Sequence, residues 1–424
     1  MRSNSAGVVQ PGRRRFIRGV SAAAAGIGAV ALWRAWPEQG FRNACHAELP
    51  ARVARHPVVD EAWNGLDPAK VWDAHAHLVG TGDSGGGAHV SAEMTTPANP
   101  RMYAQYLFYL NAGCVHDAPG AIDATYVARL QNLVDGMRRG FKVMLFAFDA
   151  VVAPTGQENI QASVFHVPNA YTAGVAARFP QYFEWVASIH PYRADCVERL
   201  DQAVQAGARA VKWLPNAMAI DPADPRCDRF YAALARHRLP LITHAGHEAA
   251  VHSPDGQRLG NPLRLRRPLE AGVRVVIAHC ATLGSSEDLD VGPNGPVHET
   301  FVFFSRLMDE PRYLGRLFGD VSAVAQRNRA GPALARLLER KEWHARLLNG
   351  SDYPLPGILP LFSIENLVAE GFLTRAVGKV LRETREHNPL LFDFVLKRHL
   401  RSNGHGFEAR VFETREFFVG ATPA

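Results

Sequence analysis

Short apolar runs alternate with amphipathic stretches along most of the chain. From residue 69 onward, each run of apolar and β-branched residues is followed by a stretch with helical spacing, which is typical of a parallel sheet covered by helices. Eight such runs occur, at residues 70–77, 142–148, 184–190, 208–214, 240–244, 273–279, 317–323 and 346–351. Eight parallel strands are the number that closes a barrel, so the pattern predicts an α/β fold, a (β/α)8 TIM barrel.

The helices between these strands are predicted from apolar spacing and boundary residues. Val127, Leu130 and Val134 recur on one side of a helical stretch, and Gly140 follows that stretch as a stop signal. Other stretches show similar spacing and lead into the next strand within a few residues. We expect helices over residues 123–139, 195–206, 226–238 and 262–271.

The chain is long enough for one barrel with extensions. Its 424 residues and 47% hydrophobic composition can bury a large core, although composition alone does not distinguish one barrel from two ordinary domains. The glycine-rich and proline-rich stretch 80–120 is either a lid at the rim of the barrel or a disordered insertion. We predict a signal segment at 1–36, an extension or linker at 37–68, a single catalytic barrel domain at 69–400 and a C-terminal tail at 401–424.

The positive charge of the chain is concentrated at its N-terminus. The formal net charge is +6, and six of the 47 basic residues are arginines within residues 1–36, which contain no Asp or Glu. The remaining 41 basic residues balance the 41 acidic residues. The sequence shows no stripe of basic residues that would follow a phosphate backbone, so nucleic acid is not expected as a partner.

The N-terminal segment resembles a twin-arginine export signal. Arg13-Arg14-Arg15-Phe16-Ile17 precedes a weakly apolar run from Gly19 to Trp33. The resemblance implies recognition by the twin-arginine export machinery, which carries folded proteins, and a periplasmic or extracellular location in a bacterium. A basic tail without this role is the alternative. The run is too short to span a bilayer comfortably, so no stable membrane span is expected, and cleavage after Ala47 would remove the segment.

The cysteines show the pattern of neither a disulfide framework nor a zinc cluster. They are odd in number, widely spaced and without a C-x-x-C pair. We therefore expect buried free thiols at Cys45, Cys114, Cys196, Cys227 and Cys280.

Polar residues stand at the C-terminal ends of most predicted strands. Strand one ends in His75-Ala76-His77, and because side chains two apart on a strand share a face, both histidines are expected to point the same way. Trp72, Ala74 and Ala76 are then expected to face the helices. The later strands end in Asp149, His190, Lys212, His244, His279 and Asp352.

This set predicts a metal site at one rim of the barrel. Neutral imidazole nitrogen is a good zinc ligand, and two imidazoles on one face suit the chelation of one cation. Each residue taken alone is more simply a hydrogen-bonded core group. That explanation does not account for five residues of ligand type at the same rim, namely His75, His77, His244, His279 and Asp352.

The order of these residues resembles the amidohydrolase superfamily of metal-dependent hydrolases. H-x-H on strand one, His244 on strand five, His279 on strand six and Asp352 on strand eight follow its pattern. The segment Gly350-Ser351-Asp352-Tyr353-Pro354 resembles the final-strand motif of the amidohydrolase-2 branch, and so does Lys212 within Ala210-Val211-Lys212-Trp213-Leu214-Pro215. The resemblance covers roughly residues 69–395 and is specific for the superfamily, not for a substrate.

The resemblance implies a divalent metal, above all Zn²⁺, with open coordination positions. Such an ion lowers the pKa of a bound water towards about 7 and polarises a carbonyl, while Asp352 accepts the proton of the attacking water. In one arrangement, a single zinc is held by His75, His77, His244 and Asp352. His279 is then free to act on the substrate or on water. In the other arrangement, carbamylated Lys212 bridges two ions, and His244 and His279 bind the second.

The other polar residues at the strand ends have two interpretations each. Lys212 can also bind an anionic group of the substrate or pair with a barrel carboxylate. His190 and Asp149 either orient the substrate and support the ligands or satisfy backbone groups of their loops. His247 and Glu248 follow strand five closely, and we expect them on a solvated loop.

The predicted function is hydrolysis of a C–N or C–O bond in a small molecule, such as an amide, lactone or ester. The closest alternative is zinc-dependent, non-oxidative decarboxylation of an aromatic or unsaturated acid, because the amidohydrolase-2 branch includes such enzymes. A third hypothesis is a non-catalytic exported barrel that binds a metal or ligand. A homo-oligomer is compatible with the sequence.

Overall fold

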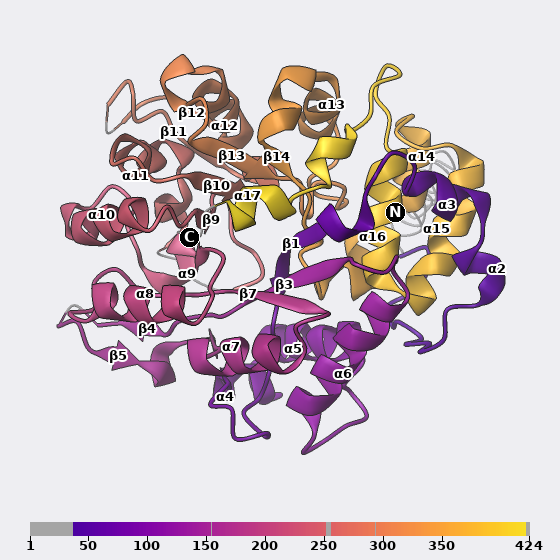
Figure 1. Ribbon diagram of the computed structural model, residues 1–424, viewed down its shortest axis with the longest axis horizontal. Coiled ribbons are helices and arrows are strands. Elements are labelled where there is room, and N and C mark those ends of the chain that lie inside the picture. Colours follow the sequence, from indigo (N-terminus) through magenta and orange to yellow (C-terminus); the bar gives the residue numbers. More distant parts are fainter. Residues whose placement is uncertain (1–36, 154, 252–255, 293, 421–424) are drawn as a thin grey trace, which may run out of the picture.

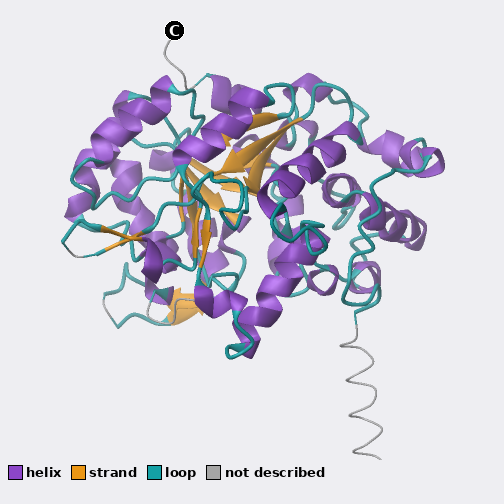
Figure 2. Cartoon of the chain, turned by 90° about the horizontal axis from the view of Figure 1, so that it is seen from below, coloured by secondary structure: helices purple, strands orange, loops and turns teal. Residues whose placement is uncertain are grey.

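The structure is a computed structural model that describes residues 37–153, 155–251, 256–292 and 294–420. The predicted export signal, residues 1–36, lies outside the described residues. Strands occupy the centre of the molecule and helices surround them (Figure 2). Among the described residues, no helix combines the length and the apolar character needed to cross a bilayer.

Eight parallel strands form two sheets. The first sheet has the order β1 (Trp72–His77), β3 (Lys142–Phe146), β7 (Phe183–Val186). The second sheet has the order β8 (Val211–Trp213), β9 (Leu241–His244), β10 (Val275–Ala278), β13 (Leu317–Asp320), β14 (Leu347–Leu348). Isolated parallel bridges join the two sheets at Ala187 with Val211 and at Ala76 with Tyr353. All eight predicted strands are confirmed, although each is shorter than its predicted run.

Helices follow most of these strands along the chain (Figure 1). The helices up to residue 236 are α2 (Ala51–Ala54), α3 (Pro57–Ala62), α4 (Ala92–Thr95), α5 (Pro100–Ala112), α6 (Ile122–Asp135), α7 (Asn169–Arg178), α8 (Cys196–Gln205), α9 (Pro215–Met218) and α10 (Asp228–Arg236). The later helices are α11 (Arg266–Glu270), α12 (Thr300–Asp309), α13 (Pro332–Glu339), α14 (Ile364–Ala369), α15 (Arg375–His387), α16 (Pro389–His399) and α17 (Arg415–Val419). Short antiparallel pairs are β2 (His89–Val90) with β6 (Phe165–His166), β4 (Val151–Val152) with β5 (Glu158–Asn159), and β11 (Ser285–Glu287) with β12 (Val297–Glu299).

The four predicted helices are present with shifted ends. The first ends at Asp135 instead of Arg139, because Gly136 is already its C-terminal cap and glycine is a poor helix former. The helix predicted over 262–271 is a 3₁₀ turn, Pro262–Leu265, that leads into α11. Asn261 caps the beginning of this turn with its side-chain oxygen.

The first strand contains an irregularity that changes the direction of its side chains. Its register against β3 shifts between Asp73 and Ala76. Trp72 and Ala74 pack in a cluster of buried residues drawn almost entirely from the strands, whereas Ala76 belongs to the larger core that includes the helices. The expectation that Trp72 and Ala74 face the helices was wrong, because the shift in register interrupts the simple alternation of side chains.

The C-terminal segment packs against the strand cluster. Phe418 on α17 is fully buried in this cluster. The hydroxyl of Thr414 donates to the carbonyl oxygen of Trp72 at 2.6 Å. The backbone N–H of Asn349 donates to the carbonyl oxygen of Val411 at 2.7 Å. Figure 1 shows α17 lying across the central strands. The predicted tail therefore contacts the central strands through Thr414 and Phe418.

The N-terminal extension also belongs to the folded body. Glu38 accepts hydrogen bonds from the backbone N–H groups of Ile364 and Glu365 at the beginning of α14. Cys45 forms a disulfide with Cys114 across a sequence separation of 69 residues. The expectation of free thiols was wrong for this pair, because the contact between the two segments depends on the fold and not on cysteine spacing. Buried free thiols are confirmed at Cys196, Cys227 and Cys280.

Truncation of Phe418 tests the role of the C-terminal segment. Phe418→Ala is expected to lower the free energy of unfolding by about 3–5 kcal/mol, because it leaves a cavity in a fully buried cluster. Val419→Ala is the matched control, since Val419 is 38% exposed. Denaturant unfolding followed by circular dichroism measures both variants, and equal effects would contradict the packing role.

Candidate metal centre

Four histidines and one aspartate meet at the C-terminal ends of the strands. They are His75 and His77 of β1, His244 of β9, His279 directly after β10 and Asp352 after β14. Nε2 of His77 lies 3.1 Å from Oδ1 of Asp352, and Nε2 of His75 lies 3.4 Å from the same oxygen. Nε2 of His279 lies 3.8 Å from Oδ2 of Asp352. One ligand atom each of His75, His279 and Asp352 lies within 4.8 Å of the other two.

His244 lies beside this group. Its ring centroid is 5.4 Å from that of His279. Nδ1 lies 3.4 Å from Oε2 of Glu248, while Nε2 is buried and has no hydrogen-bond partner among the described residues. A buried polar atom without a partner costs free energy. The unpartnered nitrogen therefore fits a metal ligand.

The donor set fits a divalent cation, because imidazole nitrogens and a carboxylate are the ligands of zinc in hydrolytic sites. Burial lowers the pKa of His75, His244 and His279 well below the ordinary value, so these rings are neutral and keep a lone pair for a metal. Burial acts to raise the pKa of Asp352, but the hydrogen bond from His77 and the nearby Lys212 act in the opposite direction, and the net shift is downward. Asp352 is therefore an ionised ligand.

Lys212 lies against the same group. Its Nζ is 3.4 Å from Nε2 of His75 and 5.2 Å from the ring centroid of Phe146. Burial lowers the pKa of this lysine, and no carboxylate oxygen of the described residues lies within 4.0 Å of its Nζ. The geometry is compatible with both predicted roles, a carbamylated ligand and a cation for an anionic substrate group.

Asp320 is a supporting residue that the sequence interpretation missed. Its Oδ2 lies 2.9 Å from Nδ1 of His75, and its Oδ1 accepts from the backbone N–H groups of His279 and Ser322 at 3.1 and 3.0 Å. Because a carboxylate only accepts, Nδ1 of His75 donates and Nε2 carries the lone pair. The available signal was an aspartate inside the seventh predicted strand, in a position comparable with the polar ends of the other strands.

Glu248 is buried, whereas the sequence predicted it on a solvated loop. Its carboxylate accepts from the backbone N–H groups of Ala250 and Val251, which bends the loop back onto His244. His247 is exposed as expected. The expectation failed for Glu248 because the hydrogen bonds that bury it come from residues further along the same loop.

The first and last strands are brought together by backbone contacts. Oδ1 of Asp73 accepts from the N–H groups of His75 at 3.1 Å and Ser351 at 2.8 Å, and the N–H of Asp352 donates to the carbonyl oxygen of His75 at 2.7 Å. A Cβ added to Gly350 would lie 2.5 Å from Cβ of His75. Glycine is therefore required for this close approach.

Unfavourable backbone conformations occur at the ligands themselves. His279, Cys280 and Ala281 have φ values of 55°, 49° and 50°, and Asp352 has a φ of 61°. Residues other than glycine in this region cost on the order of 1–3 kcal/mol each, and such residues cluster at functional sites. Two of the predicted ligands thus adopt conformations that the surrounding structure must stabilise.

Asp149 and His190 are engaged with backbone groups. Oδ2 of Asp149 accepts from the backbone N–H of His190 at 2.7 Å, and Nε2 of His190 donates to the carbonyl oxygen of Met218 at 2.8 Å. Asp149 also lies in a group with Glu158 and His166, where Arg193 pairs with Glu158 at 3.0 Å. The role of Asp149 and His190 in substrate binding stays a prediction.

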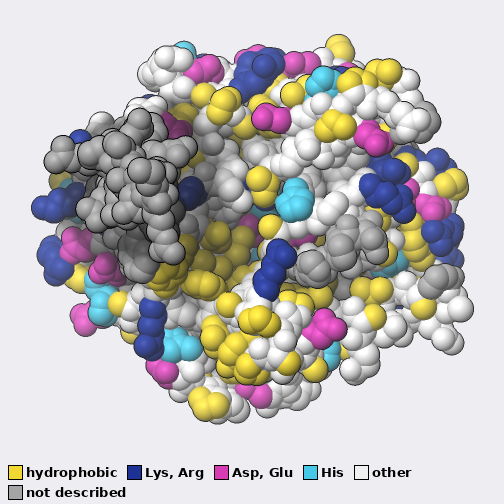
Figure 3. All heavy atoms as spheres, turned by 180° about the vertical axis from the view of Figure 1, so that it is seen from behind, with side chains coloured by type: hydrophobic (Ala, Val, Ile, Leu, Met, Phe, Trp, Pro, Cys, Tyr) yellow, Lys and Arg dark blue, Asp and Glu magenta, His cyan; other side chains and the backbone are white. Residues whose placement is uncertain are grey.

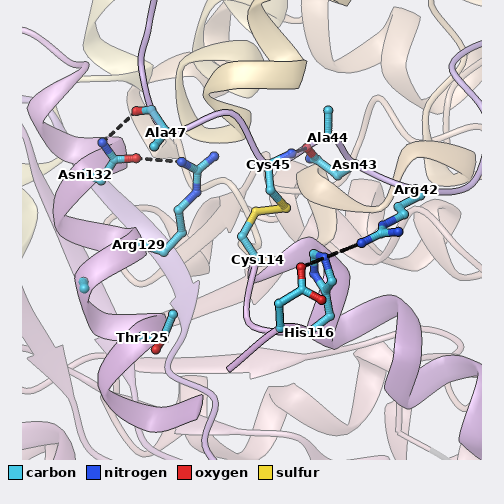
Figure 4. Close-up of a pocket in the computed structure, with 12 residues that line it drawn as sticks. Arg42, Asn43, Ala44, Cys45, Ala47, Cys114, His116, Thr125, Arg129 and Asn132 are labelled. Atoms are coloured by element: carbon cyan, nitrogen blue, oxygen red, sulfur yellow. Dashed lines mark hydrogen bonds and ion pairs between the residues drawn. A yellow bond between two sulfur atoms is a disulfide. The ribbon is translucent and has the colours of Figure 1, made fainter. Parts of the chain in front are cut away.

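A separate pocket of about 740 Å³ lies beside the disulfide (Figure 4). Cys45, Cys114, Arg129 and Asn132 are among the residues that line it, and it contains none of the predicted metal ligands. Figure 3 shows the molecule from behind, where acidic and basic side chains are interspersed and hydrophobic side chains gather near the middle of the face.

Comparisons with known proteins identify a matching family model and several similar solved structures. A family model described as amidohydrolase matches residues 72–357. Among solved structures, an uncharacterised TIM-barrel protein from Bordetella bronchiseptica shares 17% identity over 73% of this chain and 95% of that chain, with a TM-score of 0.43. A putative 2-pyrone-4,6-dicarboxylic acid hydrolase from Pseudomonas putida shares 16% identity over 76% and 97%, with a TM-score of 0.39. The 5-carboxyvanillate decarboxylase LigW from Sphingomonas paucimobilis shares 13% identity over 81% and 98%, with a TM-score of 0.43.

No curated protein matches the chain significantly. The family match spans more than half of the sequence and includes every predicted ligand from His75 to Asp352. The fold and the site thus define a parallel α/β enzyme with a group of residues that can hold a metal. The chain belongs to the amidohydrolase family.

Loss of the Asp320 carboxylate is expected to weaken metal binding. Asp320→Asn replaces one of the two acceptor oxygens with an NH2 group, so the side chain can no longer accept from both His75 and the backbone N–H groups of His279 and Ser322. Affinity for Zn²⁺ should therefore fall by about 10–100-fold. Competition with a chromophoric chelator measures this affinity. Asp60→Asn, in a surface ion pair with Arg138, is the control and should keep wild-type affinity. Unchanged affinity in Asp320→Asn would contradict the supporting role.

Proposed function

We propose that the protein is a metal-dependent hydrolase that cleaves a C–N or C–O bond of a small molecule, such as an amide, lactone or ester. The observation that carries this proposal is the placement of the Nε2 atoms of His75, His77 and His279 around the two carboxylate oxygens of Asp352. Membership of the amidohydrolase family supports the same chemistry. Family membership also makes the chain an enzyme, which disfavours the hypothesis of a non-catalytic barrel.

A single zinc ion is the preferred metal arrangement. The residues that would hold it are His75, His77, His244 and Asp352. A bound divalent cation supplies Lewis-acid chemistry, because it polarises a carbonyl and makes water more acidic. The position of Lys212 beside His75 supports a carbamate-bridged pair of ions as the second arrangement, with His279 as a further ligand.

Asp352 and His279 are the proposed catalytic residues. Asp352 is ionised and can accept a proton from the attacking water. Nδ1 of His279 lies 2.8 Å from the hydroxyl of Ser322, which fixes the ring and leaves Nε2 directed towards Asp352. His279 therefore acts on the substrate or on water in the single-metal arrangement.

A closed (β/α)8 barrel is part of this proposal. The bridges of Ala187 with Val211 and of Ala76 with Tyr353 support it, together with the hydrogen bond from His77 N–H to the Tyr353 carbonyl oxygen at 2.8 Å. Such a barrel places all of the proposed ligands at the end where barrel enzymes carry their active sites.

We also propose export by the twin-arginine machinery to an oxidising compartment. The disulfide between Cys45 and Cys114 supports this location, because disulfides persist outside the cytoplasm and are rare within it. Cleavage after Ala47 would remove Cys45 and also Glu38, which binds the beginning of α14. We therefore place the cleavage before Pro37.

Metal content and the fate of water oxygen test the proposed reaction. Protein purified without chelator should contain about one zinc per chain by plasma mass spectrometry, and oxygen from ¹⁸O-labelled water should enter the product of an amide, ester or lactone. Asp352→Asn should lower kcat by about 10²–10⁴-fold, because a general base contributes that much. Two metal ions per chain in the wild type, with fewer per chain in Lys212→Ala, would favour the carbamate arrangement. Release of carbon dioxide without incorporation of ¹⁸O would instead favour decarboxylation. A folded protein that binds no metal would overturn the proposal.

Export predicts a defined mature N-terminus. When the full chain is expressed in a bacterium with a twin-arginine system, periplasmic protein should begin at or before Pro37 and keep the disulfide. Intact mass spectrometry with and without thiol alkylation measures both properties. Replacement of Arg13, Arg14 and Arg15 by Lys should retain the protein in the cytoplasm. A mature chain that starts at Glu48 would contradict the proposed cleavage position.

A further inference from the structure

A buried arginine beside the candidate metal centre lacks an acidic partner. Arg329 is 8% exposed and lies on the segment that follows β13. Its Nη1 donates to the hydroxyl of Thr282 at 3.3 Å, and no carboxylate oxygen of the described residues lies within 4.0 Å of the guanidinium. Buried charges are normally paired, because removing them from water is costly. The guanidinium is therefore suited to an anion supplied from outside the protein.

Hydrogen bonds and charge place Arg329 at the metal centre. Thr282, its partner, donates its hydroxyl to the carbonyl oxygen of His279 at 2.9 Å. Burial is the main cause that lowers the pKa of His279, and the charge of Arg329 is the next one. The same charge contributes to the lowered pKa of His244. Arg329 thus acts on two of the histidines that surround Asp352.

The acidic residues that act on Arg329 electrostatically are occupied by other groups. They are Asp352, Glu248 and Asp320. Asp352 lies among the histidine rings, and Asp320 binds one of those rings and two backbone N–H groups. Glu248 accepts from the backbone of its own loop. None of the three is free to turn towards the guanidinium without leaving these contacts.

Two hydrogen-bond donors of one turn are buried without a partner. Nε of Arg329 and Nε2 of Gln326 have none among the described residues. The backbone N–H of Arg329 donates to the carbonyl oxygen of Gln326 at 2.9 Å, so both side chains originate from the same turn. Unsatisfied buried donors indicate a missing acceptor, and a carboxylate supplies two acceptor oxygens.

We propose that Arg329 binds a carboxylate group of the substrate, so that the enzyme acts on small organic acids. This inference rests on the proposed function for the position of the reacting bond beside the histidines. The planar guanidinium offers parallel N–H donors that match the two oxygens of a carboxylate, which a lysine ammonium cannot reproduce. Arg329 is thus a specificity residue and not a metal ligand.

Calorimetric titration of the metal-loaded protein tests this site without turnover. The probes are acetate, benzoate and 2-hydroxybenzoate, each compared with its neutral amide. At least one acid should bind the wild type more than tenfold more tightly than its amide, and Arg329→Gln should abolish this preference. Arg329→Lys keeps the charge and should lose most, but not all, of it. Arg336→Gln makes the same charge change at an exposed position of α13 and should bind like the wild type.

Metal content and thermal unfolding are measured on every variant. If Arg329→Gln does not fold, the test is the reduced preference of Arg329→Lys for acids over amides. The carboxylate site would be overturned if the wild type bound acids and amides equally well. It would also be overturned if folded Arg329 variants kept the full preference for acids over amides, and both outcomes hold even for an active hydrolase. A protein without metal or turnover that still binds acids through Arg329 would instead refute the proposed function and leave this site intact.

Discussion

The placement of the candidate metal centre depends on one buried carboxylate that joins the first strand to the end of the last. Asp73 accepts hydrogen bonds from the backbone of both His75 and Ser351, which are distant in sequence. Burial raises the pKa of this carboxyl group to about 6. Together with the hydrogen bond from the Asp352 N–H to the His75 carbonyl oxygen, these two bonds hold His75 against Asp352. The remaining histidines are arranged around that pair.

Further buried polar groups support the same junction from outside. Nζ of Lys397 on α16 donates to the carbonyl oxygen of Gly350 at 2.5 Å and to Asp393 at 2.6 Å. Burial raises the pKa of Asp393 to about 7. Asp320 performs a comparable task on the other side, where it orients His75 and holds the backbone of His279. These buried hydrogen bonds link the site to α16 and to the neighbouring strands, so the site and the surrounding fold depend on each other.

The electrostatics of the site follow from this burial. Imidazole rings removed from water remain neutral and can act as ligands. The pKa of Asp352 is instead lowered, because the hydrogen bond from His77 and the nearby Lys212 act against the effect of burial. Lys212 and Arg329 lie near the centre, and no carboxylate oxygen of the described residues is within 4.0 Å of either side-chain nitrogen group. The protein thus combines a region that can hold a cation with one that can hold an anion, which is the combination required to orient a charged substrate next to a metal.

The sequence by itself determined the eight strands, four of the helices, the family and the set of residues of ligand type. Apolar periodicity and the residue at each strand end are local properties, and the C-terminal ends of parallel strands meet at one edge in any such fold. Only the tertiary structure decided the bulge in β1, the disulfide, the burial of Glu248 and the positions of Asp320 and Arg329. Apart from the hydrogen bonds of Glu248 within its own loop, these features depend on contacts between segments that the periodicity does not relate, such as Cys45 with Cys114 or Asp320 with His75. The spacing of residues along the chain does not reveal such contacts, because they form only when the strands are assembled.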